Sequence, residues 1–256
     1  MVVGNKDGII IQARFASTRL PGKLFRTFYE EKKLIDVFLD NIINKAGKGL
    51  PVVLATSVNK KDDLFEQVAL NHKVEFFRGS EDDVLQRTID AAKKFGISTV
   101  IRVCADNPVY DIEGTLKLLK SHHGNHADYS GYCLQDGTPS IKTHLGLWGE
   151  VVELDALEKA AKMTSLKLYR EHVTNFIYGN KDIFRVNLVK APPLLYNRKD
   201  IRLTVDEIDD FELMRQIYAE LKKREYYFRL EDVVEIIDGN PGYLKTMKNQ
   251  IDKNKK

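Results

Sequence analysis

Short apolar runs of strand type alternate with amphipathic helical patterns through the first half of the chain. The strand-like runs occupy 8–13, 51–56, 74–77 and 99–104, and helical patterns at 34–46, 62–72 and 82–95 separate them. Strands that are joined by helices and short connections form mainly parallel sheets with helices on both faces. We therefore expect an α/β fold in which one sheet lies between two helical layers.

The second half of the chain departs from this alternation. Strand-like runs at 127–132 and 144–154 flank a stretch rich in turn residues, which predicts an antiparallel insertion over 126–152. Helical patterns follow at 155–163, 165–179, 209–224 and 229–238, with strands expected at 184–189 and 201–205. The short connections predict a single domain over 1–246, and the lysine-rich segment 247–256 is expected to be a frayed tail.

Composition excludes several classes of protein. The 40 Lys and Arg residues nearly balance the 37 Asp and Glu residues, and the net charge of +3 gives no general attraction to nucleic acid or membranes. Cys104 and Cys133 form no Cys-x-x-Cys pair, which argues against a disulfide scaffold or a thiolate zinc site. No apolar run is long enough to span a membrane, and the first residues lack the apolar stretch of a secretory signal, so we expect a cytoplasmic protein.

A cationic segment, Gln12 to Lys23, follows the first apolar run. In open α/β sheets, ligands bind beyond the carboxyl ends of the strands, which is where this segment is expected. Its small side chains allow backbone amides to approach a ligand, and its cations can neutralise a polyphosphate. These are Ala13, Ala16, Ser17 and Thr18, and Arg14, Arg19 and Lys23. The segment matches neither a Walker A loop nor G-x-G-x-x-G, and a solvated charged turn is the alternative interpretation.

Two aspartates follow apolar runs elsewhere. Asp106 comes after the run at 99–104, and Asp206 directly follows 201–205. If both runs are strands, both carboxylates face the crevice that holds Arg14 and Lys23. Magnesium prefers one or two protein carboxylates together with phosphate oxygens and water, so the pair is a candidate metal clamp. A helix N-cap is the alternative for either residue, and especially for Asp206.

Six segments resemble the sugar cytidylyltransferases in order and spacing, especially those of spore-coat polysaccharide biosynthesis. They are 9–25, 76–87, 100–111, 144–160, 169–177 and 201–214. The 3-deoxy-manno-octulosonate and acylneuraminate cytidylyltransferases are similar. The resemblance implies the nucleotide-diphospho-sugar transferase fold, a three-layer α/β/α sandwich. It also implies CTP as co-substrate, Mg²⁺ as cofactor, a sugar acceptor and a homodimer held by the inserted antiparallel arm.

The resemblance also assigns roles to residues. A sugar hydroxyl would attack the α-phosphorus of CTP and release pyrophosphate. The catalytic residues would be Arg14, Arg19, Lys23, Asp106 and Asp206, with Asp106 and Asp206 holding the metal. The nucleotide would be bound by Gln12, Ala13, Arg14, Ser17, Arg19, Lys23, Ser80, Arg87 and Asp106. The sugar would be bound by Glu150, Glu171, His172 and Arg202.

Some of these assignments have structural alternatives. Ser80, three residues before Asp83, is also typical of a capped helix start, and His172 on a helix is also typical of a structural histidine. Trp148 and Gly149 depart from the family pattern beside Glu150, which leaves the acceptor open.

Three other functions also remain open. One is a nucleotidyltransferase of the same fold that uses another NTP or a sugar or alditol phosphate. A second is a nucleotide-sugar-dependent glycosyltransferase, although the chain has no Asp-x-Asp motif. The third is a non-catalytic nucleotide-binding protein.

Overall fold

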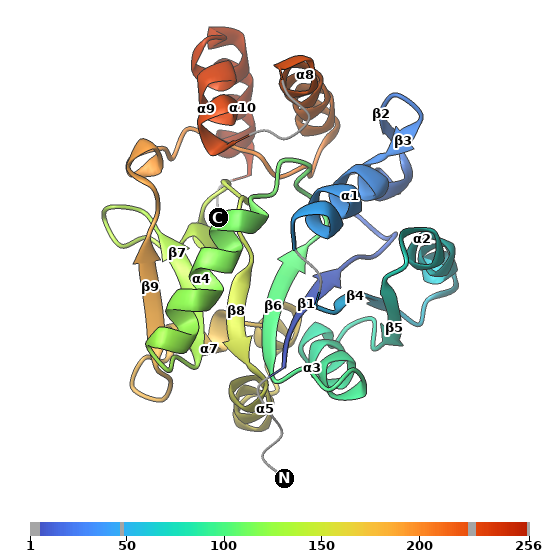
Figure 1. Ribbon diagram of the computed structural model, residues 1–256, viewed down its shortest axis with the longest axis vertical. Coiled ribbons are helices and arrows are strands. Elements are labelled where there is room, and N and C mark those ends of the chain that lie inside the picture. Colours follow the sequence, from blue (N-terminus) through green and yellow to red (C-terminus); the bar gives the residue numbers. More distant parts are fainter. Residues whose placement is uncertain (1–5, 47–48, 225–228, 255–256) are drawn as a thin grey trace.

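A seven-stranded sheet forms the centre of the protein, which is described by a computed structural model over residues 6–46, 49–224 and 229–254 (Figure 1). The strand order is β5-β4-β1-β6-β8-β7-β9. The strands are β1 (Asp7–Gln12), β4 (Val52–Ser57), β5 (Glu75–Gly79), β6 (Thr99–Cys104), β7 (Tyr129–Cys133), β8 (Glu150–Glu153) and β9 (Val186–Lys190). Only β8 runs antiparallel to its neighbours in this sheet, so the predicted mainly parallel mixed sheet is confirmed.

Helices cover both faces of this sheet. Side chains alternate along β1, so that Ile9 and Ile11 join one buried apolar cluster while Ile10 joins the other. The first cluster includes α1 (Leu34–Ala46), α2 (Leu64–His72), α4 (Ile112–Gly124), α8 (Ile208–Arg224), α9 (Leu230–Asp238) and α10 (Pro241–Lys253). The second includes α3 (Val84–Lys94), α5 (Leu154–Met163) and α7 (Asn175–Gly179). The α/β/α architecture expected from the alternating pattern is therefore present.

Antiparallel structure appears at two places. The segment 126–152 contributes β7 and most of β8 to the main sheet, with a 3-10 turn, Ser140–Lys142, between them. A separate small hairpin, β2 (Thr27–Tyr29) and β3 (Lys32–Lys33), was not predicted. Its Phe28 is buried against Phe211 and Tyr218 of α8, with ring centroids 5.4 and 5.6 Å away.

Several local expectations differ from the structure. The helix expected at 165–179 is divided into α6 (Lys167–Glu171) and α7 (Asn175–Gly179). Residues 201–205 are extended but form no strand, because Leu203 donates to His144 O and Val205 donates to Asp106 O, on two separate segments. The expected fraying of 247–256 is wrong for 247–253, which belong to α10. There Asn240 caps the helix, Pro241 occupies its first turn, and Met247 is buried. Residues 255–256 lie outside the described residues.

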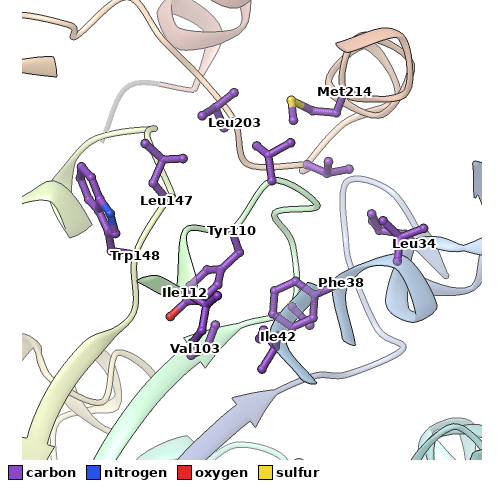
Figure 2. Packing of buried hydrophobic residues seen from close by; sticks show 14 of the residues in the cluster. Leu34, Phe38, Ile42, Val103, Tyr110, Ile112, Leu147, Trp148, Leu203 and Met214 are labelled. Atoms are coloured by element: carbon purple, nitrogen blue, oxygen red, sulfur yellow. The ribbon is translucent and has the colours of Figure 1, made fainter. Parts of the chain in front are cut away.

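The core extends from the sheet to the segment that carries Asp206. Figure 2 shows Phe38 of α1 beside Tyr110, with ring centroids 6.0 Å apart, and Leu203 and Met214 above them. All four side chains are almost fully buried. This packing fixes the loop after β6 and the extended segment 201–205 relative to each other. Within the described residues, no helix has the length and apolarity needed to cross a membrane.

His72, the last residue of α2, joins that helix to α1. Its ring nitrogens lie 2.9 Å from Asp36 Oδ1 and 3.4 Å from Asp40 Oδ1. Hydrogen bonds to Asp36 and then to Asp40 raise the pKa of His72 to about 9. The pKa of His72 in the folded protein thus exceeds its ordinary value near 6.5. The stabilisation by these two carboxylates is therefore fully present below about pH 6.5 and is lost as the pH rises through about 9.

We therefore predict that the free energy of unfolding falls more steeply with pH in the wild type than in His72→Gln. After allowance for solvent screening at this partly buried site, the difference between about pH 6 and pH 10 should be about 1–2 kcal/mol. Urea unfolding monitored by circular dichroism measures it. His123→Gln, at a more exposed histidine, is the control and should follow the wild type. Parallel curves for wild type and His72→Gln would contradict the prediction.

Candidate active site

A cavity of about 330 Å³ opens at the carboxyl ends of β1 and β6. The chain runs from β1 through β4 to β5 on one side of β1 and then returns to β6 on the other, so this is the topological switch point of the sheet. Of the predicted site residues, Gln12, Ala13, Arg14, Ser17, Arg19, Lys23, Arg87, Asp106, Glu171, His172 and Asp206 line it. Ser80, Glu150 and Arg202 do not. We refer to this cavity as the cleft.

The loop after β1 forms one wall of the cleft and is anchored at both ends. Phe15 N donates to Oδ1 of buried Asp62 over 2.7 Å, and Gly22 N donates back to Phe15 O. Gly22 has φ 66°, a left-handed conformation that glycine adopts without strain, and a Cβ there would lie 3.1 Å from the Phe15 ring. The turn at Gly22 delivers Lys23 into the cleft.

Lys23 lies between the two candidate metal ligands. Its Nζ is 3.7 Å from Asp106 Oδ2 and 3.4 Å from Asp206 Oδ1, and it also donates to Val205 O. A backbone hydrogen bond of 2.9 Å from Val205 N to Asp106 O joins the two aspartate segments directly. Residues that are far apart in sequence thus bring two carboxylates to one ammonium group.

Asp206 is held in its ionised form by surrounding cations. Burial would raise its pKa, but the charges of Lys23, Arg19 and Arg202 outweigh that effect and keep the pKa below its ordinary value. The capping interpretation of Asp206 is wrong, because Asp210 Oδ2 accepts from the backbone N of both Asp206 and Glu207 at the start of α8. The Asp206 carboxylate instead pairs with Lys23, Arg19 and Arg202 at the edge of the cleft.

The pair of carboxylates fits a hard divalent cation. The described residues contain no group of three or more His, Cys, Asp or Glu side chains placed to hold a metal. A site with two carboxylates is what Mg²⁺ uses when phosphate oxygens and water complete its octahedron. Asp106 and Asp206 therefore suit a metal that arrives with a polyphosphate better than a permanently bound one.

Two arginines, Arg14 from the loop after β1 and Arg87 from α3, also line the cleft. Arg87 is 2% exposed, its Nη1 donates to Ser80 O, and its buried Nε has no hydrogen-bond partner. Burial, and secondarily the charge of Arg14, lowers the pKa of Arg87. Arg14 Nη2 lies 3.7 Å from Oε1 of the half-exposed Glu171. Guanidinium groups donate well to anions and carbonyl oxygens, so this part of the cleft suits an anionic or carbonyl-bearing ligand.

Ser80 contacts Arg87 from outside the cleft. Its Oγ accepts from Asp83 N, and Asp83 in turn caps α3 by accepting from Gln86 N. The helix start is therefore capped, as the sequence also allowed, but the cap is Asp83 and not Ser80. Through its carbonyl, Ser80 orients Arg87 and does not itself line the cleft.

Arg102 also lines the cleft, although it was not among the site residues predicted from the sequence. Its Nη1 donates to Glu150 Oε2 over 2.8 Å, and its Nε and Nη2 donate to Gln12 Oε1. Neighbouring Cys104 also lines the cleft, and burial raises the pKa of its thiol. The available signal was a lone arginine inside the apolar run TVIRVC, because a charge in a buried strand must be paired.

Arg202 holds the Asp206 carboxylate by a hydrogen bond from the protein interior. It is almost completely buried, forms two hydrogen bonds to Asp210 of 2.7 and 2.8 Å, and donates to Asp206 Oδ2 over 3.0 Å. Its remaining nitrogen contacts His144 Nδ1. We assign Arg202 a positioning role for Asp206.

A cation-rich cleft at the switch point of a mixed, mainly parallel sheet defines a protein with the nucleotide-diphospho-sugar transferase type of fold. The chain belongs to the cytidylyltransferase family, whose sequence model matches residues 8–234. It is 30% identical over 236 residues to the Bacillus subtilis spore coat polysaccharide biosynthesis protein SpsF, covering 91% of this chain and 94% of that protein. It is 35% identical over 234 residues to an uncharacterized protein of Methanocaldococcus jannaschii, covering 91% and 90%.

Solved structures show the same architecture. A cytidylyltransferase from Leptospira borgpetersenii has a TM-score of 0.81 at 28% identity, covering 94% of this chain and 97% of that one. A CMP:2-keto-3-deoxy-manno-octonic acid synthetase complexed with CTP has a TM-score of 0.61 at 18% identity, covering 84% and 99%. At 18% identity, the similarity to this synthetase shows that the two proteins share a fold.

We predict that Arg202→Met destabilises the protein by about 3 kcal/mol or more, since it leaves the buried Asp210 without its cation. Urea unfolding measures this. Arg185→Met is the matched control, because Arg185 pairs with Asp128 while its side chain is 69% exposed, and it should cost less than about 1 kcal/mol. Equal losses in the two variants would contradict the role given to Arg202.

Proposed function

We propose that this protein transfers CMP from CTP to a sugar hydroxyl, with Mg²⁺, to give a CMP-activated sugar and pyrophosphate. The observation that carries the proposal is Lys23, which lies within 4 Å of both Asp106 and Asp206 at the switch point of the sheet. Membership in the cytidylyltransferase family supports CTP as the donor. The name of the relative SpsF supports a role in surface polysaccharide biosynthesis.

The reaction needs positioning and neutralisation of charge more than acid–base chemistry. The sugar oxygen forms a bond to the α-phosphorus, the bond from that phosphorus to the β-phosphate bridging oxygen breaks, and the hydroxyl proton passes to solvent. Arg14, Arg19 and Lys23 would bind the triphosphate, and Lys23 would neutralise the departing pyrophosphate. Ala13 and Ser17 leave room for backbone amides to approach the phosphates.

Asp106 and Asp206 would hold the metal. When bound, Mg²⁺ neutralises phosphate oxygens and lowers the pKa of a coordinated hydroxyl. The low pKa of Asp206 keeps that carboxylate ionised at neutral pH. Arg19 lies 3.0 Å from Asp206 and hydrogen-bonds Asn254 at the end of α10, so it can leave these partners for a phosphate.

Recognition of the base would fall to Arg87 and Gln12. Gln12 is fixed between Thr88, to which its Nε2 donates over 2.9 Å, and Arg102, from which its Oε1 accepts. Arg87 lines the cleft, and a guanidinium group supplies N–H donors that suit a carbonyl oxygen such as O2 of cytosine. Glu171 and His172, at the cleft edge, would border the acceptor. A homodimer and a cytoplasmic location complete the proposal.

We predict that CTP with magnesium raises the unfolding temperature, that CTP without magnesium has less effect, and that UTP, GTP and ATP have little. Ligand at about one hundred times its Kd should add about 2.7 kcal/mol to the stability. Asp106→Asn should abolish the magnesium-dependent part. Lys23→Ala and Arg19→Ala should each lower the rate of pyrophosphate release by about 10² or more.

Lys181→Ala, at an exposed position after α7, is the control and should leave both the shift and the rate unchanged. A larger shift with another triphosphate would assign a different nucleotide to the same fold. Shifts without turnover of any acceptor would favour a binding protein. Unchanged affinity and turnover in Lys23→Ala and Arg19→Ala would overturn the proposal.

A further inference from the structure

The C-terminal helix α10 ends beside the loop of cations that lines the cleft. This helix follows residues 8–234, which the family model matches, and contains none of the site residues predicted from the sequence. Arg19, which lines the cleft, donates from its Nη1 to Asn254 Oδ1 over 2.7 Å. Asn254 is the first residue after the helix. Two segments that lie 235 residues apart in the sequence thus meet at one arginine of the cleft.

Buried contacts join α10 to the segment that carries Asp206. The side chain of Met247 is buried, and its Sδ accepts from Arg202 N over 3.5 Å. Gln250, one turn further along the helix, is also buried and donates to Asp209 Oδ2 over 2.8 Å. These contacts lie on both sides of Asp206 in the sequence. They therefore fix the end of the helix relative to that carboxylate.

The side-chain amide of Asn254 is oriented by the acceptors around its NH2 group. Its Nδ2 donates to Glu207 Oε1 over 3.2 Å and to Gln250 O over 3.0 Å. Lys253 donates to the other oxygen of Glu207, and this hydrogen bond, together with that from Asn254, lowers the pKa of Glu207. The NH2 group therefore faces an ionised carboxylate, which leaves Oδ1 to accept from another donor. Arg19 supplies that donor.

Arg19 is held by two partners and keeps further donors for a ligand. Its Nη2 lies 3.0 Å from Asp206 Oδ1, while its Nη1 is engaged with Asn254. A guanidinium group carries more N–H donors than these two contacts use, so others can reach a phosphate oxygen. The side chain of Arg19 is 48% exposed, and without such contacts a long exposed side chain samples many rotamers. Ordering it only when a ligand binds would weaken binding.

We propose that Asn254 is a positioning residue for the nucleotide, because its amide holds the Arg19 guanidinium at the cleft before the triphosphate binds. The inference rests on the proposed function, in which Arg19 binds the triphosphate, and it adds the end of the C-terminal helix to the nucleotide site. Asn254 does not line the cleft and acts through Arg19. Its amide is neutral, so it orders Arg19 without cancelling the positive charge that attracts a phosphate.

A double-mutant cycle on CTP binding tests this inference. The Kd for CTP in the presence of magnesium is measured by isothermal titration calorimetry in the wild type, Asn254→Ala, Arg19→Ala and the double variant. Asn254→Ala should raise the Kd by about threefold to tenfold, the range expected for loss of one hydrogen bond. In the Arg19→Ala background the same substitution should change the Kd by less than about twofold, because the residue through which Asn254 acts is absent.

Asn249→Ala, at an exposed position of the same helix, is the matched control and should bind CTP as the wild type does. Thermal unfolding without ligand verifies that each variant keeps its fold. An unchanged or lower Kd in Asn254→Ala would overturn the inference. An equal effect of Asn254→Ala in both backgrounds would also overturn it, because it would mark a purely structural role. A wild type that does not bind CTP would overturn the proposed function, and this inference with it.

Discussion

The contact of Lys23 with Asp106 and Asp206 is the constraint on which the rest of the site depends. Three charged groups come from the loop after β1, the loop after β6 and the extended segment before α8. Two carboxylates near each other repel unless a cation lies between them. Lys23 supplies that cation in this structure, and a phosphate-bound metal would take over part of the task during the proposed reaction. Under the proposed function, the site would thus exchange one cation for another.

Buried polar interactions hold this arrangement in place. Arg202 connects Asp206 to Asp210, and Asp210 in turn caps the start of α8. Arg102 links Gln12 at the end of β1 to Glu150 on β8. Both arginines are paired on several sides, which is the condition under which a buried charge is tolerated. They fix the positions of Gln12 and Asp206 in the cleft. Arg14, Arg19 and Lys23 line the same cleft and can face a ligand.

The distribution of charge divides the site into two regions. The cleft is lined by Arg14, Arg19, Lys23 and Arg87 and suits a polyanion. A smaller adjoining cavity is lined by one arginine, Arg102, which pairs with Glu150. Asp106 lines both.

The sheet, the helical layers and the loop of cations after β1 could all be predicted from the sequence. Those features follow from local periodicity and from the rule that ligands bind at the carboxyl ends of strands. The ion-pair and hydrogen-bond partners of the buried charged residues became clear only from the folded structure. Arg202 reads as a candidate sugar ligand in the sequence, yet folding buries it against Asp210 and Asp206. Arg102 gave no motif, because its role depends on Gln12 and Glu150, which are 90 and 48 residues away. Likewise, the segment 247–253 appears polar, but burial of Met247 and the cap at Asn240 make it helix. Long-range pairing and burial have no local signature, and that is why these features required the fold.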